Sequence, residues 1–390
     1  MLEKLFERLE NEWEEMVDIR RHLHQHPEIS FKEFKTAQFI VDYYRKLDIE
    51  VTPGVGGNGV LARIQGGKPG KTIALRADFD ALPIQDEKEV PYRSTIDGVM
   101  HACGHDGHTA ALLVLAKTMN ELKAELPGTI VFIHQHAEEY APGGAKPMVE
   151  AGCLEGVDAV FGTHLWATET LGKIQYRTGP IMAAADRFEI TIQGAGGHGA
   201  QPHKTKDSIV AASQLVGTLQ QIVSRRVNPL EPAVVTIGSF VADNAFNVIA
   251  DSAKLIGTVR TFSENTRDFI INEMERIIKG TCVSADCSYT FHYDKGYPAV
   301  VNHQEETEHL VKAAEGIKGV STIEECEMQM GGEDFAYYLQ KVPGTFFFTG
   351  AQPEGVEHPY PHHHPKFDFN EKAMLTAARV LAKAAITYSE

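Results

Sequence analysis

The sequence predicts an α/β fold with a mainly parallel sheet, interrupted by an inserted domain of ferredoxin-like βαββαβ order. Three observations predict this fold class. Between residues 72 and 164, apolar strand-like runs alternate with helix-like runs, which is typical of an open α/β sheet. Near residue 182 the order changes to strand, helix, strand, strand, helix, strand. The 390 residues also exceed the size at which one core stops growing, so two domains are expected.

The first part of the chain supplies the strands and helices of the parallel sheet. An amphipathic helix-like segment comes first and ends before Pro27. The glycine-rich run at 54–59 neither opens a helix nor precedes a Lys-Ser/Thr pair, so we interpret it as a turn between strands. The elements that follow are a strand at 72–78, a helix at 107–123, a strand at 129–135, a short helix at 146–152 and a strand at 158–164.

The second part supplies the inserted domain and then returns to the α/β style. Its elements are strands at 187–193, 233–241, 252–262 and 288–293, and helices at 207–224 and 264–279. In the first of these strands apolar residues such as Phe188 alternate with polar ones such as Glu189, as a sheet with one covered face requires. A helical segment at 333–340, a strand at 344–350 and a helix at about 371–389 end the chain. We therefore expect a domain of residues 1–182 and 298–390 and an inserted domain of residues 183–297.

Composition and charge argue against several classes of partner. Thirty-seven basic and fifty-three acidic residues give a net charge of −16, which opposes binding to nucleic acid or to an anionic membrane. No apolar run approaches the roughly 20 residues that span a bilayer. Five cysteines without a secretory leader do not predict a disulfide framework. These features predict a cytoplasmic protein.

The run HACGHDGH at 101–108 carries the strongest chemical signal. Cys103 and His105 are one residue apart, so both could reach one metal ion or an adjacent pair, whereas helical zinc ligands usually lie four apart. This spacing predicts a loop. The alternative is that Cys103 is a buried free thiol, as we expect for the other four cysteines.

Polar side chains also follow the predicted strands. Asp78 and Asp80 end one strand, Glu138 and Glu139 follow another, and His164 closes the third. Ligands bind outside the carboxyl ends of the strands in open α/β sheets, so we expect a metal site at this edge. The helix that starts near residue 106 would point its N-terminus toward that site.

The acidic residues are expected to have different roles in the site. Neighbouring side chains point to opposite sides of a strand, but a turn after the strand could bring Glu138 and Glu139 to one site. One would then bind metal and the other would act as general base, because a coordinating carboxylate cannot freely exchange a proton. Asp80 would hold a ligating histidine in its orientation. The alternatives are a solvated acidic turn and acids that merely cap a strand.

The remaining histidines are harder to assign from spacing. His198 lies in the glycine-rich GAGGHGAQPH, where backbone and imidazole could approach a ligand, or which could be only a turn. The triplet at 362–364 leaves its ligand undecided. Three more histidines end the first helix, and we interpret them as a solvated helix end outside the site; they are His22, His24 and His26.

Motifs along nearly the whole chain carry a family resemblance. They are ALRADFDALPI, MHACGHDGHTA, AEE at 137–139, GTHLW, GGHGAQPH, NVI at 247–249, GTVR at 257–260, GGEDF at 331–335 and HHHPKFDF at 362–369. With them the chain resembles the aminoacylase/carboxypeptidase family of di-metal amidohydrolases. It is most similar to the branch of hippurate hydrolases, N-acyl-amino-acid deacylases and plant auxin-conjugate hydrolases.

The resemblance implies a metallopeptidase-like catalytic domain and an inserted lid or dimerisation domain. It implies that Cys103 bridges two metal ions, that Glu138 is the base, and that four residues complete the ligand shells: His105, Glu139, His164 and His363. It also implies a homodimer in which His198 polarises the substrate carbonyl in the partner's site. Asn247 would lie beside His198, and Arg260 would bind the substrate carboxylate.

The resemblance further implies hydrolysis of the amide bond of an N-acyl amino acid by two divalent transition-metal ions. Thiolate, imidazole and carboxylate ligands suit Mn²⁺ or Zn²⁺, with Co²⁺ or Ni²⁺ as alternatives. Before the acid pair, relatives often have Gln-Pro where this chain has Gln135 and His136, so the substrate preference of relatives cannot be copied. The alternatives are a dipeptidase or carboxypeptidase on the same site, a silent metal-dependent binding protein, and a redox or nucleophilic role for Cys103.

Overall fold

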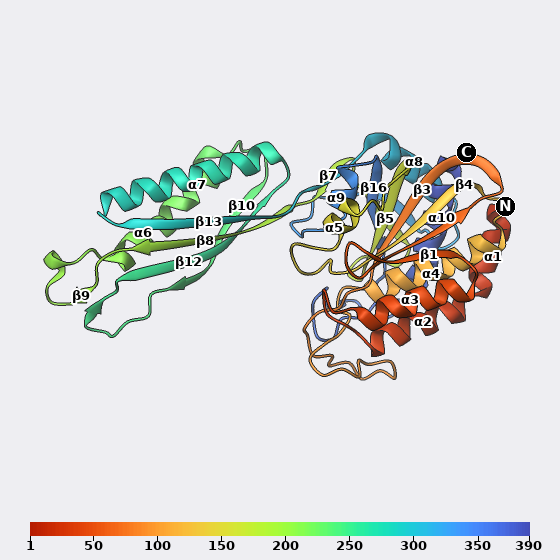
Figure 1. Ribbon diagram of the computed structural model, residues 1–390, viewed down its shortest axis with the longest axis horizontal. Coiled ribbons are helices and arrows are strands. Elements are labelled where there is room, and N and C mark those ends of the chain that lie inside the picture. Colours follow the sequence, from red (N-terminus) through yellow and green to blue (C-terminus); the bar gives the residue numbers. More distant parts are fainter. The chain divides into compact units, whose positions relative to one another are not determined.

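The computed structural model describes residues 1–390 and has the predicted α/β fold (Figure 1). Contacts divide the chain into two compact units. Unit 1 comprises Met1–Ile181, Val301–Glu327 and Asp334–Glu390. Unit 2 comprises Met182–Val300 and the short segment Met328–Glu333.

Unit 1 is built on one eight-stranded sheet. Its strands are β1 (Glu50–Val55), β2 (Gly59–Gln65), β3 (Lys68–Asp78), β4 (Pro127–Gln135), β5 (Ala159–Trp166), β6 (Lys173–Tyr176), β15 (Thr322–Glu325) and β16 (Gly344–Gly350). They lie in the order β1-β2-β4-β3-β5-β16-β6-β15. The central strands β4, β3, β5 and β16 are parallel, whereas β1 and β2 join antiparallel, and β6 pairs antiparallel with β16 but parallel with β15. Every residue of β16 is buried, as expected for a central strand covered on both faces.

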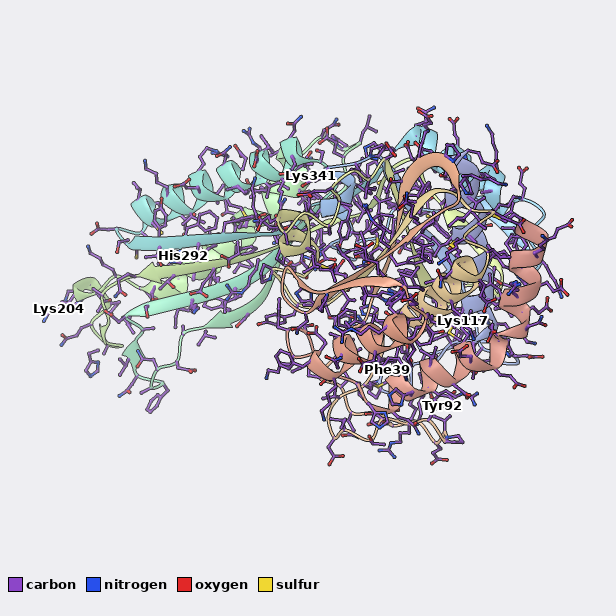
Figure 2. The ribbon with its side chains drawn as sticks, turned by 45° about the vertical axis from the view of Figure 1, so that its right-hand side comes forward. Phe39, Tyr92, Lys117, Lys204, His292 and Lys341 are labelled. Carbon is purple, nitrogen blue, oxygen red and sulfur yellow. The ribbon has the colours of Figure 1, made fainter.

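Helices pack around this sheet. They are α1 (Leu2–Asn11), α2 (Trp13–Gln25), α3 (Phe34–Lys46), α4 (His105–Glu121), α5 (Ala145–Glu150), α8 (Gln304–Ala314), α9 (Ala336–Leu339) and α10 (Lys372–Ser389). Helices α4 and α10 are buried along most of their length and both contact β3. Lys117, which is labelled in Figure 2, lies on α4. It forms ion pairs of 2.8 and 2.5 Å with Glu12 and Glu15, at the start of α2.

Unit 2 has an antiparallel sheet with two helices packed against it. Its strands are β8 (Ala184–Gln193), β10 (Ala233–Val241), β12 (Ser252–Thr261) and β13 (Ser288–Tyr297), in the order β10-β12-β8-β13. Helices α6 (Ser208–Gln221) and α7 (Glu264–Ser284) contact this sheet and each other. Phe188, Ile190 and Ile192 of β8 are fully buried in the core between sheet and helices, and the polar residues between them are not.

Short elements complete the fold. They are β7 (Gly179–Met182), which pairs with β14 (Val300–Asn302), β9 (Gly197–His198), which pairs with β11 (Val248–Ile249), the one-turn helix η1 (Pro202–Lys204) and the π-helical segment η2 (Ile222–Arg226) that continues α6. No helix combines the length and the apolar run that crossing a membrane requires.

Several elements differ from the sequence prediction, and others were not predicted, among them α3, α8, β6 and β15. The first amphipathic helix is two helices, because the chain breaks at Glu12, where φ is −91° and ψ is 14°. The helix predicted at 333–340 shrinks to the four residues of α9, and α7 continues to Ser284. The strands predicted at 233–241 and 344–350 have the observed bounds.

Candidate metal centre

The donor residues of unit 1 gather at the carboxyl edge of the parallel strands. Strand β3 ends at Asp78, β4 ends at Gln135, and His164 lies near the end of β5. Cys103 lies in the loop before α4, as predicted, but His105, which the same spacing placed in a loop, is the first residue of that helix. Gly104 caps the helix with a φ of 95°. The left-handed conformation at this glycine lets the chain turn directly from the thiol into the helix that carries His105.

Three donors form the core of the centre. The Cys103 Sγ lies 3.3 Å from the His164 Nε2. The donor atoms of Cys103, His105 and His164 all lie within 4.8 Å of one another. The spacing is compatible with shared coordination of an ion, because zinc–sulfur and zinc–nitrogen bonds are about 2.3 and 2.0 Å long.

Hydrogen bonds orient the two imidazoles. His105 Nδ1 lies 3.0 Å from the Asp80 carbonyl oxygen and 3.2 Å from the Asp80 Oδ1. His164 Nδ1 lies 2.9 Å from the Leu165 carbonyl oxygen. These oxygens are acceptors, so each Nδ1 donates a hydrogen bond and each Nε2 is left for another partner. The Nε2 of His105 is buried and has no hydrogen-bond partner. This is the arrangement in which ligating histidines are held in metal sites.

The acid pair faces the same point as these imidazoles. The chain leaves β4 at Gln135 and turns at Ala137, which has a φ of 52°. Beyond this turn the alternation of the strand no longer applies. The Glu138 Oε2 lies 3.8 Å and the Glu139 Oε1 3.9 Å from the His105 Nε2. The turn therefore brings both carboxylates to one site.

The three consecutive histidines point in different directions. The His363 Nε2 lies 3.2 Å from the Glu139 Oε1, and the donor atoms of Cys103, Glu139 and His363 form a second close group. The His362 Nε2 instead donates to the Leu165 carbonyl oxygen at 3.0 Å. His364 stacks on Tyr360 with ring centroids 4.3 Å apart. Only His363 is thus directed at the acid pair, and its φ of 66° marks the turn that places it there.

A buried hydrogen-bond network around Asp78 supports the donor cluster. Arg76 donates to the Asp78 Oδ2 at 2.6 Å, and the His108 Nδ1 donates to the Asp78 Oδ1 at 2.6 Å. The other nitrogen of His108 accepts from the Leu165 backbone N–H at 2.9 Å. Both nitrogens of His108 are therefore occupied, and this residue, to which the sequence assigned no role, fixes the backbone next to His164.

The electrostatics of the centre fit a cation. Burial lowers the pKa of His105, but Asp78, Asp80 and Glu139 together raise that pKa to about 10. Burial, with Glu139 and Glu138, holds the pKa of the Cys103 thiol well above its usual value. The His105 Nε2 is buried without a hydrogen-bond partner. Excess negative charge and an unpartnered donor atom are the features that bound metal ions would satisfy.

The remaining predicted residues lie in unit 2. The antiparallel pair β9–β11 sets His198 opposite Val248, so His198 and Asn247 lie close together, and the Gly199 N–H donates to the Asn247 carbonyl oxygen at 2.8 Å. His198 is exposed, and its Nδ1 accepts from the Ala200 N–H at 3.1 Å.

Arg260 lies elsewhere in unit 2. It is near the end of β12, opposite the end that pairs with Gln193 and leads toward His198. Its Nε donates to the Met330 carbonyl oxygen at 3.1 Å. Unit 2 therefore does not bring Arg260 to His198.

The prediction for His24 was wrong. His22 and His26 are exposed, but His24 is fully buried. Its Nδ1 lies 2.8 Å from the Asp106 Oδ2 and its Nε2 lies 3.2 Å from the Asp86 Oδ2. The spacing of Arg20 and His24, four residues apart on the helix face that also buries Leu23, was the signal that could have shown this.

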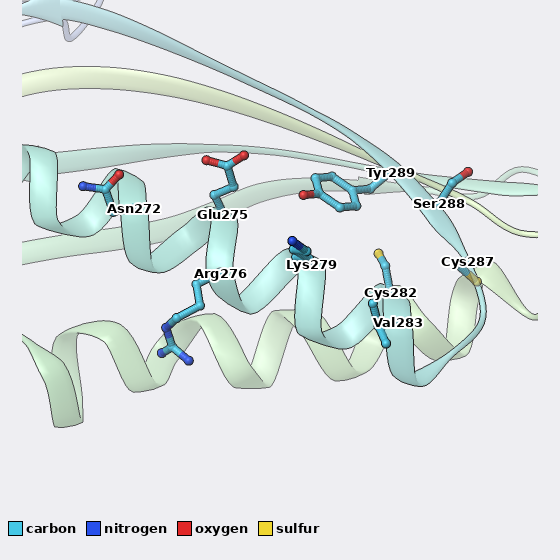
Figure 3. Close-up of a pocket in the computed structure, with 9 residues that line it drawn as sticks. All are labelled: Asn272, Glu275, Arg276, Lys279, Cys282, Val283, Cys287, Ser288 and Tyr289. Atoms are coloured by element: carbon cyan, nitrogen blue, oxygen red, sulfur yellow. The ribbon is translucent and has the colours of Figure 1, made fainter.

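A cavity of about 580 Å³ opens on the surface of unit 2 between α7 and β13 (Figure 3). Its lining includes Asn272, Arg276, Lys279, Cys282 and Cys287. None of the predicted metal ligands lines it. Both cysteines are free thiols, as expected.

The fold and this donor cluster define a metal-dependent hydrolase of the α/β class. The chain belongs to peptidase family M20/M25/M40, whose model matches residues 74–387. It is 64% identical over 378 residues to YhaA of Bacillus subtilis (strain 168), a protein named for amidohydrolase activity, covering 97% of this chain and 96% of that one. The family resemblance inferred from the motifs is thereby confirmed, and the chain is a hydrolytic enzyme.

Two further relatives bear on the chemistry. The N-acyl-L-amino acid amidohydrolase of Geobacillus stearothermophilus is 50% identical over 291 residues, covering 75% of this chain and 79% of that one. The crystal structure of the Bacillus subtilis YxeP protein, described as a dinuclear metal-binding peptidase of the M20 family, is 37% identical and has a TM-score of 0.84. That comparison covers 97% of this chain and 98% of YxeP.

Proposed function

We propose that this protein hydrolyses the amide bond of N-acyl amino acids at a dinuclear metal centre, releasing a carboxylic acid and a free amino acid. One observation carries the proposal. Glu138 and Glu139 lie within 3.9 Å of the unpartnered His105 Nε2, so one carboxylate could bind metal while its neighbour exchanges a proton. The relative from Geobacillus stearothermophilus carries the name of this activity.

The same geometry and the family resemblance support a ligand set. Cys103 would bridge two ions, with His105, Glu139, His164 and His363 as the other ligands. When bound, divalent ions would polarise the substrate carbonyl and lower the pKa of water. The mixture of thiolate, imidazole and carboxylate favours Mn²⁺ or Zn²⁺, with Co²⁺ or Ni²⁺ also compatible.

The protein's own residues carry the proton. Glu138 would accept a proton from the attacking water and return it to the amide nitrogen, because an amine is a poor leaving group until it is protonated. Asp80 would keep the His105 imidazole in its ligating orientation through the contact with Nδ1. One carboxylate thus serves both as base and as acid.

Replacing Glu138 with Gln tests the assignment. The amide has the size of the carboxylate but cannot accept the proton, so we expect the variant to keep its metal content and to lose 10²-fold or more in kcat. Elemental analysis and turnover of acetyl, benzoyl and longer acyl amino acids would be measured on the Mn²⁺, Zn²⁺ and Co²⁺ forms. Glu150→Gln, at an exposed glutamate that ends α5, is the control. Near wild-type turnover in Glu138→Gln would refute the role.

A peptidase activity is the second candidate, because YxeP is described as a peptidase. A dipeptidase or carboxypeptidase would share the metal centre but would accept substrates with a free amino group on the acyl side. Comparing a dipeptide with its N-acetylated counterpart distinguishes the two functions. A higher kcat/KM for the free dipeptide would favour the peptidase.

We also propose that the protein is a homodimer formed through unit 2. Strands β10 and β13 are the two edges of its sheet, and an unpaired edge is a template for pairing with another chain. Phe246 is fully exposed, with a relative accessibility of 102%. In this dimer His198 would act in the site of the partner, as the family resemblance implies.

Mixing two inactive variants tests a shared site. If His198 acts in the partner's site, dimers of one His198→Ala and one Glu138→Gln subunit contain one complete site and regain activity. The expected recovery is up to a quarter of the wild-type rate per subunit for random mixing of equal amounts, since half of the dimers are mixed. The controls are His198→Ala alone and Glu138→Gln alone, each taken through the same mixing procedure. Mixed dimers without recovered activity would contradict action in the partner's site.

A further inference from the structure

Two strained turns of unit 1 share one hydrogen-bond acceptor. Phe31 and Ala137 adopt left-handed backbone conformations with φ values of 66° and 52°. Such values are uncommon for residues other than glycine, and for a bulky residue they mark a position that the surroundings must hold. The Phe31 N–H and the Ala137 N–H both donate to the Glu33 Oε1, each at 2.9 Å.

Glu33 is itself firmly placed. It is fully buried, and its Oε2 accepts from the Asn58 Nδ2 at 3.0 Å. Its backbone forms the start of α3, where the Ala37 N–H donates to the Glu33 carbonyl oxygen at 3.0 Å. The shared acceptor oxygen is therefore fixed by a helix and by a side chain from the turn between β1 and β2.

Ala137 is the residue directly before the acid pair. After it, the Glu139 N–H donates to the Asp80 Oδ2 at 2.9 Å. The same Oδ2 accepts from the Ser30 Oγ at 2.7 Å. The backbone that presents Glu138 and Glu139 is thus held at both ends by a buried carboxylate, with Glu33 at the first end and Asp80 at the second.

We propose that Glu33 is a positioning residue for the metal centre: it holds Ala137 in its left-handed conformation, which directs Glu138 and Glu139 toward His105. The inference deepens the proposed function, since it rests on the acid pair serving as metal ligand and base. Without the shared oxygen, alanine returns to its preferred right-handed or extended conformations. The two carboxylates then leave the positions in which they face the His105 Nε2.

The test combines three variants. Glu33→Ala removes the acceptor, and we expect Zn²⁺ affinity, measured by competition with a chelator, to fall ten- to a hundredfold, as for other residues that orient ligands. We expect kcat to fall by at least as much. Glu33→Gln keeps an acceptor oxygen in the same place and should retain most of both. Ala137→Gly in the Glu33→Ala protein should recover part of the affinity, because glycine adopts positive φ readily.

The recovery separates positioning from general destabilisation. Glu306→Ala is the matched control, because Glu306 is also buried in unit 1 and accepts from the Tyr388 hydroxyl at 2.5 Å on a different part of the unit. It should lower the melting temperature and leave Zn²⁺ affinity unchanged. Unchanged affinity in Glu33→Ala, or no recovery with Ala137→Gly, would overturn the proposal.

Amide hydrogen exchange distinguishes failure of this inference from failure of the proposed function. The Ala137 and Glu139 amide N–H groups donate hydrogen bonds to buried carboxylates. In Glu33→Ala the hydrogens of both amides should exchange with solvent at least tenfold faster. This readout requires neither metal nor substrate. If the wild type neither binds Zn²⁺ nor cleaves N-acyl amino acids, the proposed function fails, and the exchange rates alone then decide the role of Glu33. Unchanged exchange would refute it.

Discussion

The histidines of HACGHDGH show how neighbours decide the role of a residue. His105 has its Nδ1 bonded to Asp80 and its Nε2 without a partner, so one nitrogen remains for a ligand. His108 has both nitrogens occupied, by Asp78 and by the Leu165 N–H. His101 has neither nitrogen occupied, and burial lowers its pKa to about 4. One motif thus holds a candidate ligand, a support and a buried neutral ring.

Much of the candidate site could nevertheless be predicted from the sequence. The donors follow the ends of predicted strands, and parallel strands bring those ends to one edge. The prediction for His24 failed because its partners lie far away along the sequence. His24 is buried because it bonds to Asp86 and Asp106, which are 62 and 82 residues away along the chain. The helical spacing of Arg20 and His24 indicates a buried helix face, but it does not identify these distant partners.

At the scale of elements, helix α4 positions His105 by close packing of its first turn. Gly107 lies in this turn, and a Cβ there would lie 2.5 Å from the Phe369 Cζ and 2.8 Å from the Leu165 Cδ1. Both of these side chains are buried, so neither can move freely. We expect Gly107→Ala to destabilise the protein by about 1–3 kcal/mol and to weaken metal binding by shifting α4. Urea unfolding and chelator competition would measure the two effects.

Helix α6 supplies the control for this change. Gly217 lies in its interior, and no atom lies within 4 Å of the position that a Cβ would occupy. There the same substitution removes only the entropic cost of glycine in a helix, so Gly217→Ala should stabilise the protein by about 0.5–1 kcal/mol. Equal effects of the two substitutions would contradict the close packing around α4.

The elements that could be predicted are those with a strong local pattern. Strand β16 is a continuous apolar run that is fully buried, and its bounds match the prediction. Strands β6 and β15 were not predicted. They are four residues each and largely half-buried or exposed, so neither has a continuous apolar run, and the alternation in β6 (KIQY) is too short to predict a strand. They form at the sheet edge because β6 pairs with β16 and with β15, which is a tertiary effect.

At the scale of the whole molecule, buried histidines link stability to pH. His134 in β4 is fully buried, its Nε2 lies 2.7 Å from the Tyr44 hydroxyl oxygen, and burial lowers its pKa to about 3. The unfolded chain has an ordinary histidine pKa near 6.5. Between these two values the unfolded state binds a proton that the folded state excludes. The contribution of His134 to stability is therefore complete above about pH 6.5 and is lost as the pH falls toward 3.

Replacing His134 with Gln tests this dependence. Glutamine still offers a hydrogen-bond partner to the Tyr44 hydroxyl but does not titrate. When the pH is lowered from 7.5 to 5, we expect the wild type to lose about 2 kcal/mol more unfolding free energy than His134→Gln. The value follows because pH 5 lies about 1.5 units below the unfolded histidine pKa, and each unit contributes about 1.4 kcal/mol. Urea unfolding with excess chelator excludes effects of metal binding, and His358→Gln, at an exposed histidine, should keep the wild-type loss. If His134→Gln lost as much stability as the wild type, the proton excluded on folding would have to belong to other groups.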